Sequence, residues 1–437
     1  MLENFALDAE VFDNPLIKWQ LVALRFMGYV FARTDSFPLL HFLRGILVSI
    51  SIFVLVFAQN CGDRNPYPLD AGRDQMARST WLHSDNLERL SPALCTSITY
   101  ANLFIKILAF YCYRKRFNQM LTNAKVGLKK VLITSLPKEI QMYNGYIKYI
   151  TTMNYTIVMP FIVIVLMIFA EGAYYIRHQS QEWTIQRQEG NSTKAKGMDH
   201  LFVLYCTGSL SESFFFTFIL PYYMVLVGGC SLYTWHTFSA ALMRFISFRL
   251  DVVKYRLENM SEYADYLLKK VQSSGNHNCI SSRPRLLQCV LASCVEDFTE
   301  IKLFACNYGH ISSITVFIES ATTSALLCLQ LYILSKDFTV GDTVYAAWSV
   351  VTVGMLWVYY WHANEISDKS NEITNALYSF KWYEEPLSLQ KDIALFMTAS
   401  MKPIIMKSGF LYINIDSFCK ILKTSYSYFT LLQNFVE

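Results

Sequence analysis

The chain has 437 residues, of which 53% are hydrophobic and only 16% are charged, and its formal net charge is +4. A soluble domain of this size carries about a quarter charged residues, so the composition excludes an ordinary soluble domain. The apolar residues gather in runs of roughly 20, the length that crosses about 30 Å of hydrocarbon as an α-helix. We therefore predict an all-α, polytopic membrane protein.

Residues 1–38 precede the first long apolar run. Charged residues such as Glu3, Asp8 and Lys18 interrupt this segment, and no small-residue cleavage site follows an early apolar core, so we expect no signal peptide. Residues 15–31 read PLIKWQLVALRFMGYVF. The proline at the start and the mixed polarity predict an amphipathic helix that lies along the membrane surface.

Seven later segments have the length and apolarity of transmembrane helices. They lie at residues 39–59, 92–112, 150–176, 210–241, 312–335, 342–362 and 412–436. Helical patterns continue beyond the fourth span and precede the fifth, which predicts helices that project from the membrane on the cytoplasmic side.

Lysine and arginine are unequally divided between the two sets of connecting segments. The set that includes the N-terminus carries 23 and the opposite set carries 9, and the richer set is assigned to the cytoplasm. Seven spans then place the C-terminus outside the cell. This orientation is opposite to that of a G-protein-coupled receptor, and no Asp-Arg-Tyr motif follows the third span.

Three Asn-x-Ser/Thr sequons occur, at Asn154, Asn191 and Asn259. Asn154 falls inside a predicted span, and Asn259 lies on the side that the charge distribution assigns to the cytoplasm. Glycosylation needs an extracellular loop, so Asn191 is the expected site.

Enzyme signatures are missing from the sequence, which has no H-E-x-x-H, G-x-S-x-G or P-loop pattern. The 11 cysteines form no C-x-x-C pair, and the eight histidines form no cluster at metal-ligand spacing. We expect no catalytic residue, no metal and no cofactor. Cys61 and Cys206 are the two cysteines expected near the outer face, either as a disulfide or as free thiols.

The most distinctive stretch is residues 361–435, which follows the sixth span and ends in the seventh. It contains NEISDKSNEITNALYSFKWYE, then a PLSLQKD turn, a KPIIM strip and a terminal ILKTSYSYFTLLQNF. This order resembles the C-terminal third of insect odorant receptors.

The resemblance implies a subunit of a ligand-gated, nonselective cation channel in the plasma membrane of olfactory sensory neurons. Such a subunit forms a heterotetramer with the odorant receptor coreceptor and opens when it binds a small volatile organic molecule. No G protein is required, and no nucleic-acid partner is expected. The implied division is residues 1–362 for the N-terminal segment, six spans and odorant pocket, 363–411 for a cytoplasmic subunit-assembly region, and 412–437 for a pore-lining helix.

The last span is more polar than a lipid-facing helix should be, because it contains Lys420, Lys423 and several hydroxyl and amide side chains. By the resemblance, Leu431 and Phe435, four residues apart on one helix face, match the family's hydrophobic gate, with Leu432 as an alternative to Leu431. The other pore-lining candidates are Ser427, Thr430, Gln433 and Asn434.

Aromatic and small residues in the second, third, fourth and sixth spans suit a small, mostly apolar ligand that is bound by burial. The candidate ligand-binding residues are Ser97, Tyr100, Ala101, Val158, Phe161, Ile162, Ser213, Thr217, Tyr345, Trp348 and Ser349.

Three alternatives remain open at the level of sequence. The coreceptor carries a long insertion between its fourth and fifth spans, whereas that loop is short here (242–298), which favours a ligand-tuned subunit. A gustatory receptor channel shares the topology, but its Thr-Tyr and Gln-Phe ending is altered here, where Asn434 precedes Phe435. A non-channel membrane protein such as a transporter would show internal repeats, which the two halves of this chain lack.

Overall fold

The structure, a computed structural model, describes residues 87–134, 136–188, 220–273, 283–335, 342–409 and 411–436. Several expectations lie outside the described residues and are not addressed by it: the surface helix at 15–31, the span at 39–59, Ser213 and Thr217, Asn191, and the Cys61–Cys206 pair.

The described residues are nearly all helical, as the sequence predicted. The helices are α4 (Leu87–Cys112), α5 (Arg114–Thr134), α6 (Pro137–Gln188), α7 (Leu220–Glu258), α8 (Met260–Ser273), α9 (Arg283–Leu334), α10 (Asp342–Ser379), α11 (Leu387–Ser400) and α12 (Ile415–Val436). A 3-10 turn, η5 (Trp382–Glu384), links α10 to α11, and a short antiparallel hairpin, β1 (Lys407–Ser408) and β2 (Leu411–Tyr412), precedes α12.

Within the described ranges, four helical segments are long and apolar enough to cross a membrane: Leu94–Cys112, Pro137–Ala170, Arg283–Leu334 and Thr343–Glu384. They contain, or largely overlap, the expected second, third, fifth and sixth spans. The expected fourth and seventh spans fall in α7, described from Leu220, and in α12, and neither helix is among these four segments. The seventh falls short of a membrane span by composition because Lys420, Lys423 and a series of hydroxyl side chains interrupt it.

Several helices are far longer than a bilayer is thick. Helices α6 and α9 have 52 residues each, about 78 Å at 1.5 Å per residue, whereas the hydrocarbon core is about 30 Å. Helix α7 has 39 residues. The predicted helical continuation of the fourth and fifth spans is therefore confirmed.

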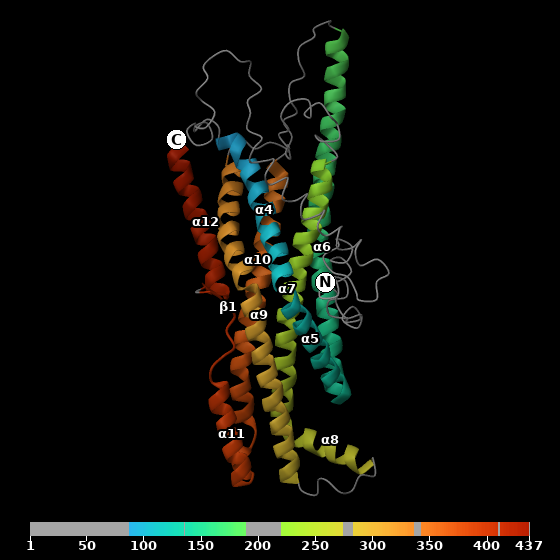
Figure 1. Ribbon diagram of the computed structural model, residues 1–437, viewed down its shortest axis with the longest axis vertical. Coiled ribbons are helices and arrows are strands. Elements are labelled where there is room, and N and C mark those ends of the chain that lie inside the picture. The colour runs from blue at the N-terminus through green and yellow to red at the C-terminus, as the bar shows by residue number, and fades with distance from the viewer. Residues whose placement is uncertain are drawn as a thin grey trace.

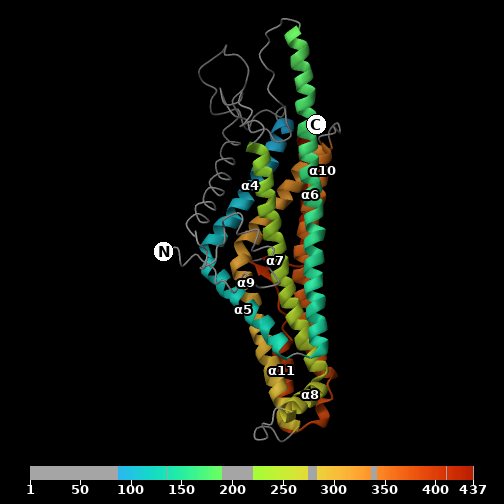
Figure 2. The same ribbon diagram turned by 90° about the vertical axis from the view of Figure 1, so that its right-hand side faces the viewer.

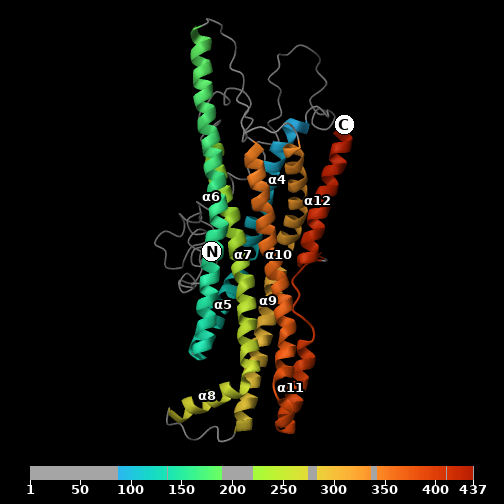
Figure 3. The same cartoon turned by 180° about the vertical axis from the view of Figure 1, so that it is seen from behind.

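The molecule is elongated, with two halves along its long axis. In the upper half of Figure 1, α4 and the upper parts of α7, α9 and α10 form a bundle, and α12 flanks it and runs up to the C-terminus. In the lower half, α11 lies beside α10, and α8 projects outwards (Figures 1 and 3). Figure 2 shows α5 slanting across the bundle. Helix α10 passes through the expected domain boundary at 362 and ends at Ser379.

The lower half is held by an aromatic core and by buried ion pairs that join α6, α7 and α9. Arg256 contacts both carboxylate oxygens of Glu139 at 2.6 and 3.2 Å and reaches Asp297 Oδ2 at 2.8 Å. Arg249 contacts the other oxygen of Asp297 at 2.9 Å. Burial lowers the pKa of Arg256, but its hydrogen bonds to Glu139 and the charge of that carboxylate outweigh burial and raise the pKa. The guanidinium therefore stays charged.

The connection between α11 and α12 is fixed to the middle of α9. Gly409 has a φ of 61°, in the left-handed region that glycine adopts without steric cost. In this conformation its N–H donates to Ser313 Oγ at 2.9 Å, and the Ser408 hydroxyl donates to the Ser313 carbonyl oxygen. The start of α12 is thus positioned by contacts with α9.

Candidate ligand pocket

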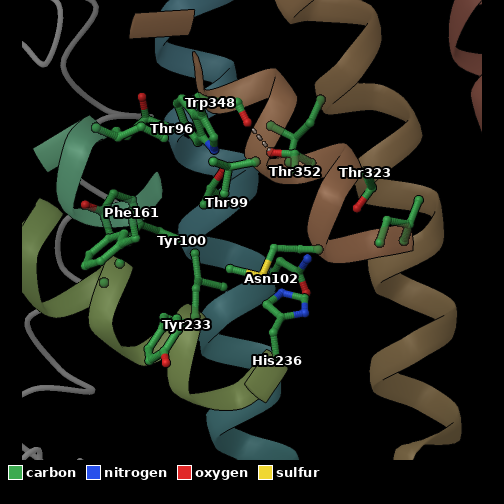
Figure 4. A pocket seen from close by; sticks show the side chains of 18 of the residues that line it. Thr96, Thr99, Tyr100, Asn102, Phe161, Tyr233, His236, Thr323, Trp348 and Thr352 are labelled. Atoms are coloured by element: carbon green, nitrogen blue, oxygen red, sulfur yellow. Dashed lines mark hydrogen bonds between the residues drawn. The ribbon is translucent and has the colours of Figure 1, made fainter. Parts of the chain in front are cut away.

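A cavity of about 170 Å³ lies inside the upper half of the bundle and is lined by α4, α6, α7, α9 and α10 (Figure 4). An engineered protein cavity of about 150 Å³ holds benzene. The cavity therefore has room for a molecule about the size of a substituted six-membered ring.

The walls are mostly apolar. Aliphatic and aromatic side chains from four helices line them: Phe161, Ile164, Val165, Ile168, Leu232, Leu326, Val344, Trp348, Val351, Met355 and Leu356. Such a surface binds a ligand mainly by removing apolar area from water, roughly 25 cal/mol per Å².

Three of the polar side chains in the walls already donate to backbone carbonyls. The Thr99 hydroxyl donates to Cys95 O at 2.8 Å, and the Thr352 hydroxyl donates to Trp348 O at 2.9 Å. The Tyr233 hydroxyl donates to Asn154 O at 3.1 Å, which ties α7 to α6. These hydroxyls have therefore used their only proton, and toward a ligand they can only accept.

Two adjacent glycines on α7 allow aromatic rings to approach the backbone. A Cβ at Gly228 would lie 2.6 Å from the Tyr100 ring, and a Cβ at Gly229 would lie 2.2 Å from the Phe161 ring. Both distances are far below van der Waals contact. The glycine pair thus sets where the rings of α4 and α6 sit at the edge of the cavity.

The floor of the cavity carries a polar cluster formed by three helices: Lys106 on α4, His236 on α7 and Glu319 on α9. Lys106 Nζ lies 2.8 Å from Glu319 Oε1, and His236 Nε2 lies 3.1 Å from the same oxygen. Lys106 Nζ and His236 Nε2 are 3.4 Å apart. The lysine side chain is 1% exposed. The free-energy cost of burying its charged ammonium is therefore offset by this pairing.

The four nominated spans all contribute to the cavity, and some of the nominated residues that the structure describes line it while others do not. Tyr100, Phe161 and Trp348 line it. Ser97 is buried outside the lining, Ile162 is 43% exposed on the outer surface of α6, and Ala101 and Val158 are partly buried. The Tyr345 ring stacks on Trp348 with centroids 6.2 Å apart, and the Ser349 hydroxyl contacts Gln330 Oε1 at 3.0 Å.

The expectations missed the contribution of α9, which supplies Glu319, Thr323 and Leu326, and also missed the glycine pair and Asn102. The sequence feature that could have identified the polar floor and the contribution of α9 was the presence of ionisable residues in apolar helices. Lys106, His236 and Glu319 each lie within an apolar helix, and ionisable residues in a membrane helix face the protein interior and mark functional sites by default.

Helix α12 packs on α9 and α10 through one face. Phe418, Ile421 and Ser425 are buried, and the Ser425 hydroxyl contacts Ser324 Oγ of α9 at 3.3 Å. The Phe418 ring lies 5.3 Å from that of Trp357 on α10. The other faces of α12 are exposed in the single chain.

The gate candidates lie on an exposed face of α12, where Leu431 is 53% and Phe435 is 77% exposed. Leu432 is partly buried. Of the four other pore-lining candidates, Ser427 and Asn434 are exposed, whereas Thr430 and Gln433 are partly buried. In the described part of the chain, no group of three or more His, Cys, Asp or Glu side chains could hold a metal ion.

Membrane-length helices around a small, mostly apolar cavity define a helical membrane protein with an internal small-molecule pocket. The sequence model of the 7tm odorant receptor family matches residues 86–426. The chain belongs to this family, which consists of receptors rather than enzymes.

Similar proteins agree with the family assignment. The chain is 22% identical to odorant receptor 56a of Drosophila melanogaster over 99% of this chain and 98% of that receptor. It is 24% identical to odorant receptor Or2 of Anopheles gambiae over 49% of this chain and 55% of that one. The fold is similar to that of the insect olfactory receptor OR5 of Machilis hrabei, solved in complex with eugenol, with a TM-score of 0.70 at 11% identity, covering 96% of this chain and 97% of that one. The family match favours an odorant over a gustatory receptor.

Proposed function

We propose that this protein is the ligand-tuned subunit of an odorant-gated, nonselective cation channel formed with the odorant receptor coreceptor in the plasma membrane of olfactory sensory neurons. The observation that carries the proposal is the small cavity lined by five helices, one of which, α9, also packs against α12. The OR5 structure with eugenol supports a small organic ligand for this fold.

The proposed topology has seven spans, a cytoplasmic N-terminus and an extracellular C-terminus. The distribution of Lys and Arg, 23 against 9, supports this orientation. The lower ends of α6, α7 and α9, which carry the buried ion pairs, then project into the cytoplasm.

In this proposal α12 lines the pore. At 100° per residue, Lys420, Thr424, Ser427, Leu431 and Phe435 fall on one face of the helix. That face is exposed in the single chain. A mixed face of this kind is costly against lipid but suits a wet pore, and a ring of Leu431 and Phe435 from several subunits would close it by excluding water.

Helix α9 is the proposed link between the pocket and the pore. Glu319 and Thr323 line the cavity, while Ser320 contacts the Tyr360 hydroxyl at 2.8 Å and Ser324 contacts Ser425 of α12. A ligand that binds better when α9 is displaced would therefore also bias the position of α12, since a ligand shifts a conformational equilibrium only through its differential affinity.

The segment 363–411 is the proposed subunit-assembly region. Its exposed surface includes large apolar side chains, among them Leu387, Leu395 and Met401. Exposed apolar patches of this kind mark interaction sites, and the lower half of α10 with α11 provides a rigid base for them.

The test is whole-cell current in cells that express this chain with or without an insect coreceptor, during exposure to a panel of volatiles. We expect odour-evoked, nonselective cation current only when both chains are present. Current from this chain alone would instead make it a self-sufficient channel. Responses to sugars or bitter compounds would favour a gustatory receptor instead. The absence of any current despite surface expression and ligand binding would reject channel activity.

A further inference from the structure

We infer that the floor of the cavity, formed by Asn102, His236 and Glu319, is a subsite for a hydroxyl group, so that the preferred ligands are small alcohols about the size of a six-membered ring. The inference deepens the proposed function and rests on it insofar as the ligand is an odorant.

Asn102 provides the first hydrogen-bond acceptor. Its Nδ2 donates to Thr322 Oγ1 at 3.1 Å, and the Thr322 hydroxyl in turn donates to Ile318 O at 2.8 Å. Because the proton of Thr322 is already used, the amide orientation is fixed with Oδ1 as the remaining atom. Asn102 lines the cavity, and its Oδ1 is buried with no partner among the described residues. A buried acceptor without a partner is costly, and a ligand O–H would satisfy it.

Glu319 provides a second acceptor. Both contacts of Glu319, with Lys106 and with His236, go to Oε1, so Oε2 has no contact among the described residues. A carboxylate oxygen can only accept, so Oε2 suits a ligand O–H. His236 Nε2 lies between the Lys106 ammonium and Glu319 Oε1 and helps to hold the carboxylate in place. His236 and Asn102 both line the cavity (Figure 4).

Charge decides which donor group the floor accepts. Lys106 already neutralises Glu319, so this ion pair carries no net charge. An ammonium ligand would add an unbalanced charge to a mostly apolar cavity, which is strongly unfavourable. A ketone, ester or aldehyde can only accept, so it would leave Asn102 Oδ1 and Glu319 Oε2 without a donor. A hydroxyl donates without carrying charge and is the group that the floor suits.

The direct test compares cyclohexanol with cyclohexanone, which match in size and differ in the ability to donate. Dose–response currents are recorded from cells that express this chain with the coreceptor, and the same two compounds are tested for thermal stabilisation of the purified chain, which measures binding without gating. We expect cyclohexanol to act at a concentration at least roughly tenfold lower than cyclohexanone in both assays.

Three variants test whether the floor residues create the preference for the alcohol over the ketone. Glu319→Gln replaces a carboxylate oxygen by an NH₂ donor, so it should lower the alcohol preference at least roughly tenfold and favour the ketone. The pair Lys106→Met with Glu319→Gln makes the same change without leaving the lysine unpaired, in case the single variant fails to fold. Asn102→Leu removes one acceptor at nearly constant size and should weaken the preference. Thr299→Val is the matched control: it lies on α9 outside the cavity lining and its hydroxyl donates to Val295 O at 2.8 Å, so the alcohol-to-ketone ratio should stay within about twofold.

The outcomes separate this inference from the proposed function. Equal potency of alcohol and ketone in currents and in binding would overturn the inference and leave the channel proposal standing. Cyclohexanol binding without any evoked current would uphold the inference and reject the channel. An alcohol preference that survives in all three floor variants would also overturn the inference, since some other group would then create it.

Discussion

Lys106, His236 and Glu319 lie in three different helices that are otherwise apolar at this depth. A charged side chain at the centre of a membrane helix costs about 2.5–3.5 kcal/mol even on permissive scales, so each charge is tolerable only with its partners. Because the three contact atoms lie within 3.4 Å of one another, the cluster fixes α4, α7 and α9 relative to one another at the base of the cavity.

We predict that Lys106→Met destabilises the protein much more than the double replacement Lys106→Met with Glu319→Gln. Breaking a buried pair by removing one partner costs about 3–5 kcal/mol, whereas removing both charges is often close to neutral. Thermal unfolding of the purified protein measures both effects. Lys381→Met is the control, because its contact with Glu384 spans 4.0 Å between largely exposed side chains, and such pairs contribute little. Equal losses in the single and double variants would contradict the pairing argument.

The second prediction at this scale concerns the glycine next to Phe161. Gly229→Ala would place a Cβ 2.2 Å from that ring, so the ring must move within or out of the cavity. We expect odour potency to change at least roughly tenfold, since a small displacement of a binding group has large consequences. Gly354→Ala on α10 is the control, because a Cβ there meets nothing within 4 Å. A dose–response curve that stays unchanged in Gly229→Ala would show that the ring position does not shape the site.

At the scale of elements, the connection into α12 is the segment most sensitive to a substitution that disturbs the backbone conformation. A Cβ at Gly409 meets nothing within 4 Å, but the φ of 61° is strained for any residue with a side chain. We predict that Gly409→Ala lowers stability by about 1–2 kcal/mol, measured by thermal unfolding. Gly409→Asn should lose less, because asparagine adopts this conformation more readily. Equal losses in the two variants would mean that side-chain bulk, and not backbone conformation, is the cause.

The helices were more predictable from sequence than the site. Apolar length alone placed the second, third, fifth and sixth spans, and the periodic patterns after 241 and before 312 predicted the long extensions of α7 and α9. The lining residues depend on helix rotation. In α4 the sequence suggested Ser97, Tyr100 and Ala101, but of these only Tyr100 lines the cavity, together with Thr96 and Thr99. One residue is 100° of rotation, and no local pattern fixes rotation when most faces of a helix are apolar.

The contribution of α9 was missed for a related reason. Its core-facing residues are distributed around much of its circumference, because it contacts α4, α7, α10 and α12. A helix that is buried on several sides shows little amphipathic periodicity, so its cavity-facing residues do not stand out. Interpreting Glu319 as an intramembrane charge that needs a partner would have identified both the helix and its depth.

At the scale of the whole molecule, α9 lines the pocket with Glu319 and Thr323 and contacts α12 through Ser324. The chain by itself leaves Leu431 and Phe435 exposed near its C-terminus, and in the proposed channel the corresponding residues of the four subunits would meet around one axis. The gate is therefore a property of the proposed assembly, whereas the described lining of the pocket comes from a single chain.

This division predicts how gate variants behave. Leu431→Ser and Phe435→Ser, expressed with the coreceptor, should raise the current without ligand, because polar side chains allow water into a constriction that apolar ones keep dry. Whole-cell recording before and after odour measures this, and the concentration of odorant needed for half-activation reports any change in the pocket.

Tyr426→Ser is the matched control. Tyr426 is 61% exposed but lies roughly 140° around the helix from Leu431 at 3.6 residues per turn, so this variant should leave the unliganded current unchanged. Unliganded current that stays at the original level in both gate variants would remove Leu431 and Phe435 from the gate, and an increase in Tyr426→Ser alone would assign the pore to a different face of α12.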